Sequence, residues 1–149
     1  MEATFRTLDE LALFARDFVT KLSPKEGSAT LVTLSGELGA GKTAFAQALA
    51  EALGVTYLVT SPTFVLEKIY ALPEDTGRGF MHLIHIDAYR LRDSSELAAL
   101  GFDEVMSVPE NLVLLEWPEN VRDTLHAPAF SLTLTAREDD SRSLSLSYG

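Results

Sequence analysis

The chain has 149 residues, of which 46% are hydrophobic and 23% are charged. These proportions are typical of globular proteins and argue against a disordered chain, and the length predicts a single domain over residues 1–149. No cysteine is present, which excludes disulfide bonds and thiolate metal sites. The apolar runs are too short for a membrane helix and the first ten residues lack a secretory signal, so we expect a soluble cytoplasmic protein without a membrane partner.

The net charge is −10, with 22 acidic and 12 basic residues. Proteins that bind nucleic acid unaided usually present a basic face, because contacts to phosphate supply most of the affinity. We therefore expect no strong direct binding of RNA or DNA. Arg90 and Arg92 in "YRLR" are compatible with a small basic patch, although such a pair is more often ordinary solvated surface.

The first third of the chain predicts a helix, a strand and a second helix. Residues 7–22 repeat apolar side chains at helical spacing, and a capping-box pattern begins at Thr7. "ATLVTLS", residues 29–35, has the length and composition of a buried strand. "TAFAQALAEALG", residues 43–54, is an alanine-rich helix that ends at Gly54, where a helix C-terminal glycine is expected.

The remaining elements predict hairpins and short helices. After a turn at Ser61-Pro62, one strand, a polar turn over residues 73–79 and a second strand over residues 80–91 form a hairpin. The later elements are a capped helix over 93–101, a strand over 111–117, a proline-led helix over 118–125 and a terminal hairpin of residues 129–136 and 143–149. This order predicts an α/β fold with a mixed, mainly parallel sheet flanked by helices, and with antiparallel hairpins.

"GELGAGKT", residues 36–43, lies between the first predicted strand and the helix that follows it. Gly36, Gly41, Lys42 and Thr43 match the pattern G-x-x-x-x-G-K-[ST]. Glycines let main-chain N–H groups turn inward around an anion, and the start of the helix adds its positive dipole end. Lys42 would reach the β- and γ-phosphates and Thr43 would offer its hydroxyl to Mg²⁺. The alternative is a glycine-rich turn that merely joins strand to helix, but the flanking elements favour a P-loop nucleotide site.

Two acidic residues end apolar strands. Asp87 ends "HLIHID" and Glu116 ends "LVLLE". Phosphoryl transfer needs a carboxylate at such a position, so either residue could hold Mg²⁺ or orient the attacking water. The sequence does not decide between them, and capping of the following helix is an alternative role for Glu116.

Three further kinds of residue have a functional and a plain structural interpretation. Thr63, in "SPT", could sense the γ-phosphate as a switch threonine, or could belong to a simple turn. Trp117 is either a core residue or an aromatic that faces a partner. His82 and His85 alternate with apolar residues, so we expect them to be strand side chains rather than ligands.

Taken in order, "GELGAGKT", "SPTF", "HIDAYRL" and "EWPE" resemble the TsaE (YjeE) family over roughly the whole chain. These are small bacterial P-loop ATPases that help to make N6-threonylcarbamoyladenosine in tRNA. The resemblance implies that one loop binds the phosphates of ATP, and its residues are Gly36, Glu37, Leu38, Gly39, Ala40, Gly41, Lys42 and Thr43.

The resemblance also implies roles for residues outside the loop. Thr43 and Glu116 would contact Mg²⁺, and Asp87 would take a Walker B-like role in hydrolysis and also stand near the metal. Lys42, Asp87 and Glu116 are thus the expected catalytic set, while Thr63 and Trp117 would lie beside the nucleotide. The expected partners are the proteins TsaB and TsaD, with tRNA reached only through their complex. The hairpin tip "LPEDTGRGF" is longer and more charged than is usual in the family.

Other functions fit the sequence less well. A small-molecule P-loop kinase needs an arginine-rich lid, and the arginines here are spread along the chain. A GTPase needs an Asn-Lys-x-Asp element, and neither asparagine is followed by lysine. A pure binding module would not need Lys42, Thr43, Asp87 and Glu116 together. We expect an ATPase with weak intrinsic activity, because the motifs contain no convincing arginine finger. Arg90 and Arg92 are candidates, but a partner could supply or order the missing group.

Overall fold

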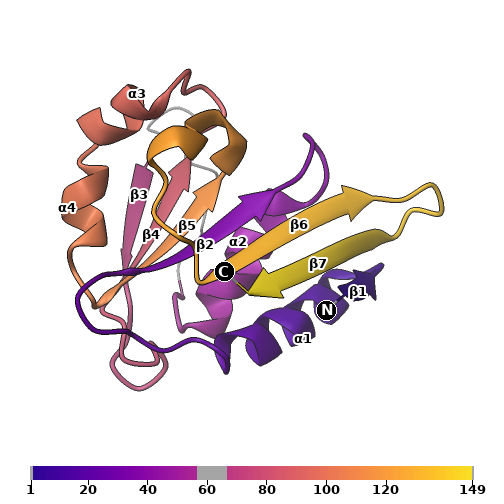
Figure 1. Cartoon of the computed structure of the whole chain (residues 1–149). Coiled ribbons are helices and arrows are strands. Elements are labelled where there is room, and N and C mark those ends of the chain that lie inside the picture. Colours follow the sequence, from indigo (N-terminus) through magenta and orange to yellow (C-terminus); the bar gives the residue numbers. More distant parts are fainter. Residues whose placement is uncertain (1, 57–66, 149) are drawn as a thin grey trace.

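The computed structural model describes residues 2–56 and 67–148. One seven-stranded sheet runs in the order β1-β7-β6-β2-β5-β4-β3 (Figure 1). Its strands are β1 (Glu2–Phe5), β2 (Thr30–Ser35), β3 (Glu67–Ala71), β4 (His82–Asp87), β5 (Asn111–Glu116), β6 (Phe130–Ala136) and β7 (Arg142–Tyr148). The helices are α1 (Leu8–Val19), α2 (Lys42–Ala52), α3 (Ser94–Ala99), α4 (Phe102–Met106) and the 3₁₀ segment η1 (Pro118–Thr124).

The predicted α/β class is confirmed. Strands β6, β2, β5 and β4 form a parallel centre, and β7, β1 and β3 add antiparallel strands at its two edges. Both predicted hairpins, β3–β4 and β6–β7, are present. The parallel centre matters for function because the carboxyl ends of its strands meet at one edge, where ligands bind in open α/β sheets.

Several boundaries differ from the sequence prediction. Strand β1 was not predicted, because four residues are too few to show alternation and its stability comes from pairing with β7. Helix α4 was also missed. Helix α1 ends at Val19 and not at residue 22, because the chain turns at Thr20. The predicted turn at Ser61-Pro62 lies outside the described residues.

Helices cover both faces of the sheet (Figure 1). Helices α1 and α2 pack on one face, where Phe18, Phe45 and Leu49 are fully buried against residues such as Leu114. Elements α3, α4 and η1 pack on the other face, against residues such as Val113. Side chains alternate along a strand, so neighbouring residues of β5 enter different cores. Residues two apart therefore share a face.

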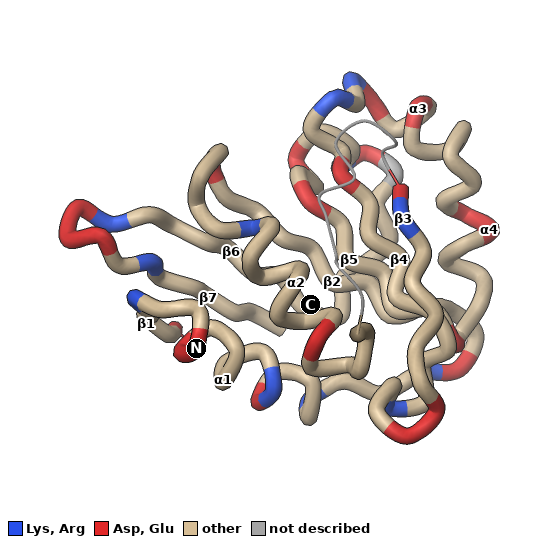
Figure 2. The backbone as a smooth tube through the Cα atoms, turned by 180° about the vertical axis from the view of Figure 1, so that it is seen from behind, with Lys and Arg blue, Asp and Glu red and all other residues tan. Residues whose placement is uncertain are grey.

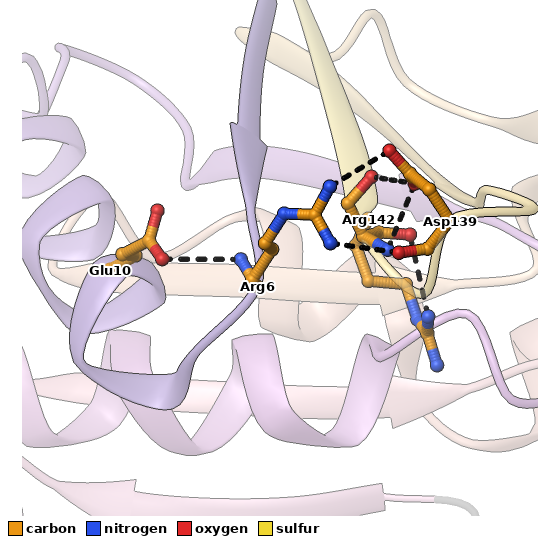
Figure 3. Close-up of polar contacts among 5 residues, drawn as sticks. Arg6, Glu10, Asp139 and Arg142 are labelled. Atoms are coloured by element: carbon orange, nitrogen blue, oxygen red, sulfur yellow. Dashed lines mark hydrogen bonds and ion pairs between the residues drawn. The ribbon is translucent and has the colours of Figure 1, made fainter.

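A polar contact joins the start of α1 to the β6–β7 turn (Figure 3). Arg6 donates from Nη1 to the Asp139 carbonyl at 2.8 Å and from Nη2 to Asp139 Oδ2 at 2.9 Å. The Arg6 side chain is 59% exposed and that of Asp139 is 54% exposed, so solvent screens the pair and its contribution to stability is small.

The long hairpin tip lies at the carboxyl ends of α1 and α2. Thr76 Oγ1 donates to the Leu53 carbonyl at 2.9 Å, and Arg78 Nη2 donates to the Thr20 carbonyl at 3.2 Å. Gly54 adopts φ +95°, and a Cβ there would meet Thr76 Oγ1 at 2.0 Å, so the tip packs on a position that only glycine fits. The tip is thus separated from the glycine loop by the length of α2, about 16 Å for eleven residues.

No helix within residues 2–56 and 67–148 is long and apolar enough to cross a membrane. Acidic and basic residues are interspersed along the described backbone (Figure 2).

Candidate nucleotide site

The glycine loop joins the carboxyl end of β2 to α2. Gly41 precedes α2 at φ +107° and has no side chain that could cap the helix. The N-cap residue therefore gives the first-turn N–H groups of α2 no side-chain acceptor, and the positive end of the helix dipole is available to an anion. Gly36 brings the loop close to β6, since a Cβ at this position would lie 2.7 Å from the Leu134 carbonyl oxygen.

Lys42 is buried at the start of α2, with 7% of its surface exposed. Its ammonium group donates to the Gly36 carbonyl and, at 3.2 Å, to the Glu37 carbonyl, and it lies 4.1 Å from the ring centroid of Trp117. Burial lowers the pKa of Lys42, and the negative charge of Glu116 opposes that shift. The lysine is therefore held in the loop by carbonyl groups and by an aromatic face rather than by a direct salt bridge.

Asp87 and Glu116 are neighbours in register at the carboxyl ends of β4 and β5. Their exposed fractions are 6% and 3%. Burial raises the pKa of Asp87, while the Tyr89 N–H, which donates to Asp87 Oδ1 at 2.9 Å, acts in the opposite direction. Glu116 Oε2 contacts Nε2 of the buried His85.

Two aromatic rings form a wall beside these carboxylates. Tyr89 and Trp117 lie 5.0 Å apart between ring centroids. Trp117 has φ +59°, a left-handed conformation, and its backbone N–H donates to the Leu34 carbonyl at 3.3 Å. Asn120 Nδ2 donates to the carbonyls of Ala88 and Tyr89 at 2.9 and 3.2 Å. The side chain of Asn120 thereby fixes the loop after β4 to η1.

These groups surround a hollow of about 390 Å³. Its lining residues are Leu38, Gly39, Gly41, Lys42, Thr43, Ala44, Asp87, Tyr89, Glu116 and Trp117. Gly36, Glu37 and Ala40 instead line a second hollow of about 300 Å³ between the loop and the end of β6, which Leu38 also borders. The structure therefore brings most of the sequence-predicted residues together, whereas Thr63 lies outside the described residues.

His85 is a side chain of strand β4, as the sequence predicts, but its contact with Glu116 and the position of Tyr89 were not predicted. His85 stands two residues before Asp87 and so shares its face of the sheet. That spacing was the available signal. Tyr89 has no such signal, because its place beside Trp117 depends on how the loop after β4 turns.

Within the described residues, no three His, Asp or Glu side chains gather into a group that could hold a metal by themselves. Mg²⁺ in nucleotide sites is usually bound by one or two protein oxygens together with phosphate oxygens and water. The adjacent carboxylates of Asp87 and Glu116 and the hydroxyl of Thr43, all on one hollow, fit that donor set.

The sheet has a parallel centre, a glycine loop joins its central strand β2 to α2, and two carboxylates end the adjacent strands β5 and β4. These features define the P-loop NTPase class of fold. The family model for "Threonylcarbamoyl adenosine biosynthesis protein TsaE" matches residues 5–144. The chain belongs to the TsaE family, in threonylcarbamoyladenosine biosynthesis.

Individual relatives agree with this assignment. The tRNA threonylcarbamoyladenosine biosynthesis protein TsaE of Bacillus subtilis is 37% identical over 114 residues, which cover 76% of this chain and 66% of that protein. The TsaE protein of Rickettsia prowazekii is 32% identical over 144 residues, covering 96% of this chain and 92% of that protein. The crystal structure of Bacillus subtilis YdiB superposes with a TM-score of 0.76 at 27% identity, covering all of this chain and 86% of that one.

Proposed function

We propose that this protein binds and hydrolyses ATP with Mg²⁺ and so switches a complex of TsaB and TsaD during the synthesis of N6-threonylcarbamoyladenosine in tRNA. One observation carries the proposal: Lys42 and Thr43 of the glycine loop line the same hollow as Asp87 and Glu116. An anion site, a hydroxyl and two carboxylates are the parts that phosphoryl transfer needs.

Each side chain has a chemical role in this proposal. The amides of residues 36–43 cradle the phosphates, with Lys42 turning from the loop carbonyls to the β- and γ-phosphates. Thr43 and Glu116 hold Mg²⁺, which neutralises charge on the phosphate oxygens when bound. Asp87, with its raised pKa, either assists in holding the metal or accepts a hydrogen bond from the attacking water.

Weak intrinsic turnover follows from the surroundings of the hollow. None of the described residues that line it is an arginine. Arg90 and Arg92 are exposed, one and three residues after Tyr89. We therefore infer that the TsaB–TsaD complex supplies or orders a further cation at the γ-phosphate. The acidic net charge of −10 supports a protein that reaches tRNA only through these partners.

Binding is tested by isothermal titration with ATP, ADP and GTP in the presence of Mg²⁺. We expect adenine nucleotides to bind more tightly than GTP. Lys42→Ala should lose about 10- to 100-fold in affinity, because a charge-assisted hydrogen bond contributes about 1.5–3 kcal/mol. Lys25→Ala, at an exposed lysine in the α1–β2 loop, is the matched control and should bind normally. Normal affinity in the Lys42 variant would contradict the proposal.

Turnover is tested by phosphate release with and without TsaB and TsaD. We expect slow release from the protein alone and a marked increase with the partners. Brisk turnover without partners and no stimulation by them would exclude the switch. Adding candidate phosphate acceptors tests for a small-molecule kinase, since ATP consumption would then depend on the acceptor.

A further inference from the structure

His85 is a buried polar residue that the proposed chemistry has not used. It lies on β4 with 1% of its surface exposed, and its Nε2 contacts Oε2 of Glu116 on β5. His85 pairs in register with Leu114, and Asp87 pairs with Glu116. The imidazole therefore lies behind the two carboxylates, on the same face of the sheet and one step further from the hollow.

The contact defines where the imidazole carries its proton. A carboxylate accepts hydrogen bonds, so Nε2 carries the N–H that faces Oε2. No described residue makes a hydrogen bond to Nδ1, which is buried.

The hydrogen bond restrains Glu116. With Oε2 held by His85, rotation of the carboxylate about its terminal bond would break a buried contact. The same side chain lines the hollow beside Lys42 and Thr43, so Oε1 is the oxygen left for a ligand. A carboxylate whose second oxygen is fixed in this way needs no reorientation when a metal arrives.

We propose that His85 is a positioning residue, which holds Glu116 in the orientation that binds the Mg²⁺ of the nucleotide complex. This inference rests on the proposed ATP site and adds a residue to it. Loss of an outer partner of a metal ligand typically costs 10- to 100-fold in metal affinity. We therefore expect His85→Leu to raise the Mg²⁺ concentration needed for tight ATP binding by that factor.

The experiment is isothermal titration with ATP at a series of Mg²⁺ concentrations and in excess chelator. His85→Leu should bind ATP normally in chelator and should respond to Mg²⁺ only at higher concentration. His85→Gln, whose amide NH₂ reaches the position of Nε2, should restore much of the Mg²⁺ response. His82→Leu, on the opposite face of the same strand, is the matched control and should resemble the wild type.

A merely structural role gives a different pattern, in which His85→Leu melts at lower temperature but keeps the wild-type Mg²⁺ response. That result, or an equal loss of affinity with and without Mg²⁺, would overturn the inference while leaving the ATP site intact. If His85→Leu does not fold, the comparison of His85→Gln with His85→Asn decides, because the shorter amide does not reach Glu116. A wild-type protein that binds no ATP would instead overturn the proposed function, and this inference with it.

Discussion

Replacing Gly36 by alanine tests how closely the glycine loop packs on the sheet. A Cβ at Gly36 would lie 2.7 Å from the Leu134 carbonyl oxygen of β6 and 3.3 Å from the Ala40 Cβ. The first distance is well below van der Waals contact, and its partner is backbone that is paired in the sheet. The loop must therefore move away from β6, and it carries the anion site with it.

The cost follows from two terms. Overpacking of this kind costs about 1–3 kcal/mol, and φ +155° adds strain of about 1–3 kcal/mol for a residue with a Cβ. For a chain of 149 residues each kcal/mol lowers the melting temperature by about 2–4 °C. We expect Gly36→Ala to melt at least about 4 °C below the wild type and to lose most of its affinity for ATP.

Alanine variants of two other glycines distinguish the effect of the steric clash from that of backbone strain. Gly39 at φ +83° and Gly27 at φ +85° have nothing within 4 Å of a built Cβ, so alanine at either position meets strain alone, about 1–2 kcal/mol. Gly39→Ala lies in the loop and Gly27→Ala lies outside it. Melting curves followed by circular dichroism should place Gly36→Ala below both. Equal melting temperatures for the three variants, or ATP binding by Gly36→Ala as tight as that of Gly27→Ala, would refute the reasoning.

Three further predictions concern single side chains. Trp117, the only tryptophan, lies beside Lys42, so its fluorescence should change during titration with ATP, and Lys42→Ala should abolish that change at the same concentrations. Burial raises the pKa of Asp87, so the folded protein binds this proton more tightly than the unfolded chain and stability falls as pH rises from 3.8 through the raised value. Above that window Asp87→Asn should be at least as stable as the wild type without nucleotide, with the advantage shrinking toward pH 3.8 in denaturant titrations. Arg6→Ala should leave the free energy of unfolding almost unchanged in the same assay, because its pair with Asp139 is exposed and screened by solvent.

The sequence predicted those parts of the fold whose signal is local. The periodicity of residues 7–22, the alternation of the terminal hairpin and the capped helix at Asp93 all correspond to elements of the structure. Strand β1 and helix α4 are four and five residues long, too short to show a period. Strand β1 depends on pairing with β7, and helix α4 depends on packing against the sheet. Neither contact can be predicted from the residues of the segment alone.

In the candidate site, too, the features with a local sequence signal were predictable, and those that depend on the assembled sheet were not. The glycine loop is one contiguous motif, and Asp87 and Glu116 stand out because each ends an apolar strand. Their adjacency depends on the register of β4 and β5, which is a property of the assembled sheet. The contact of His85 with Glu116 depends on that same register. The sequence therefore predicts His85 only as a strand side chain, although its spacing of two residues from Asp87 can be seen.

The distribution of buried ionisable residues indicates that the carboxyl end of the parallel strands serves binding and catalysis rather than stability. Among the described residues, the buried Asp, Glu, Lys, Arg and His side chains are Lys42, His85, Asp87 and Glu116. All four meet at the glycine loop and the adjoining strand ends, although the two apolar cores offer many other positions. Burying such groups generally costs more free energy than their mutual attraction returns, and apolar residues of similar volume would stabilise the fold better. A cluster of buried ionisable groups at one end of the sheet is expected where binding and catalysis need those groups.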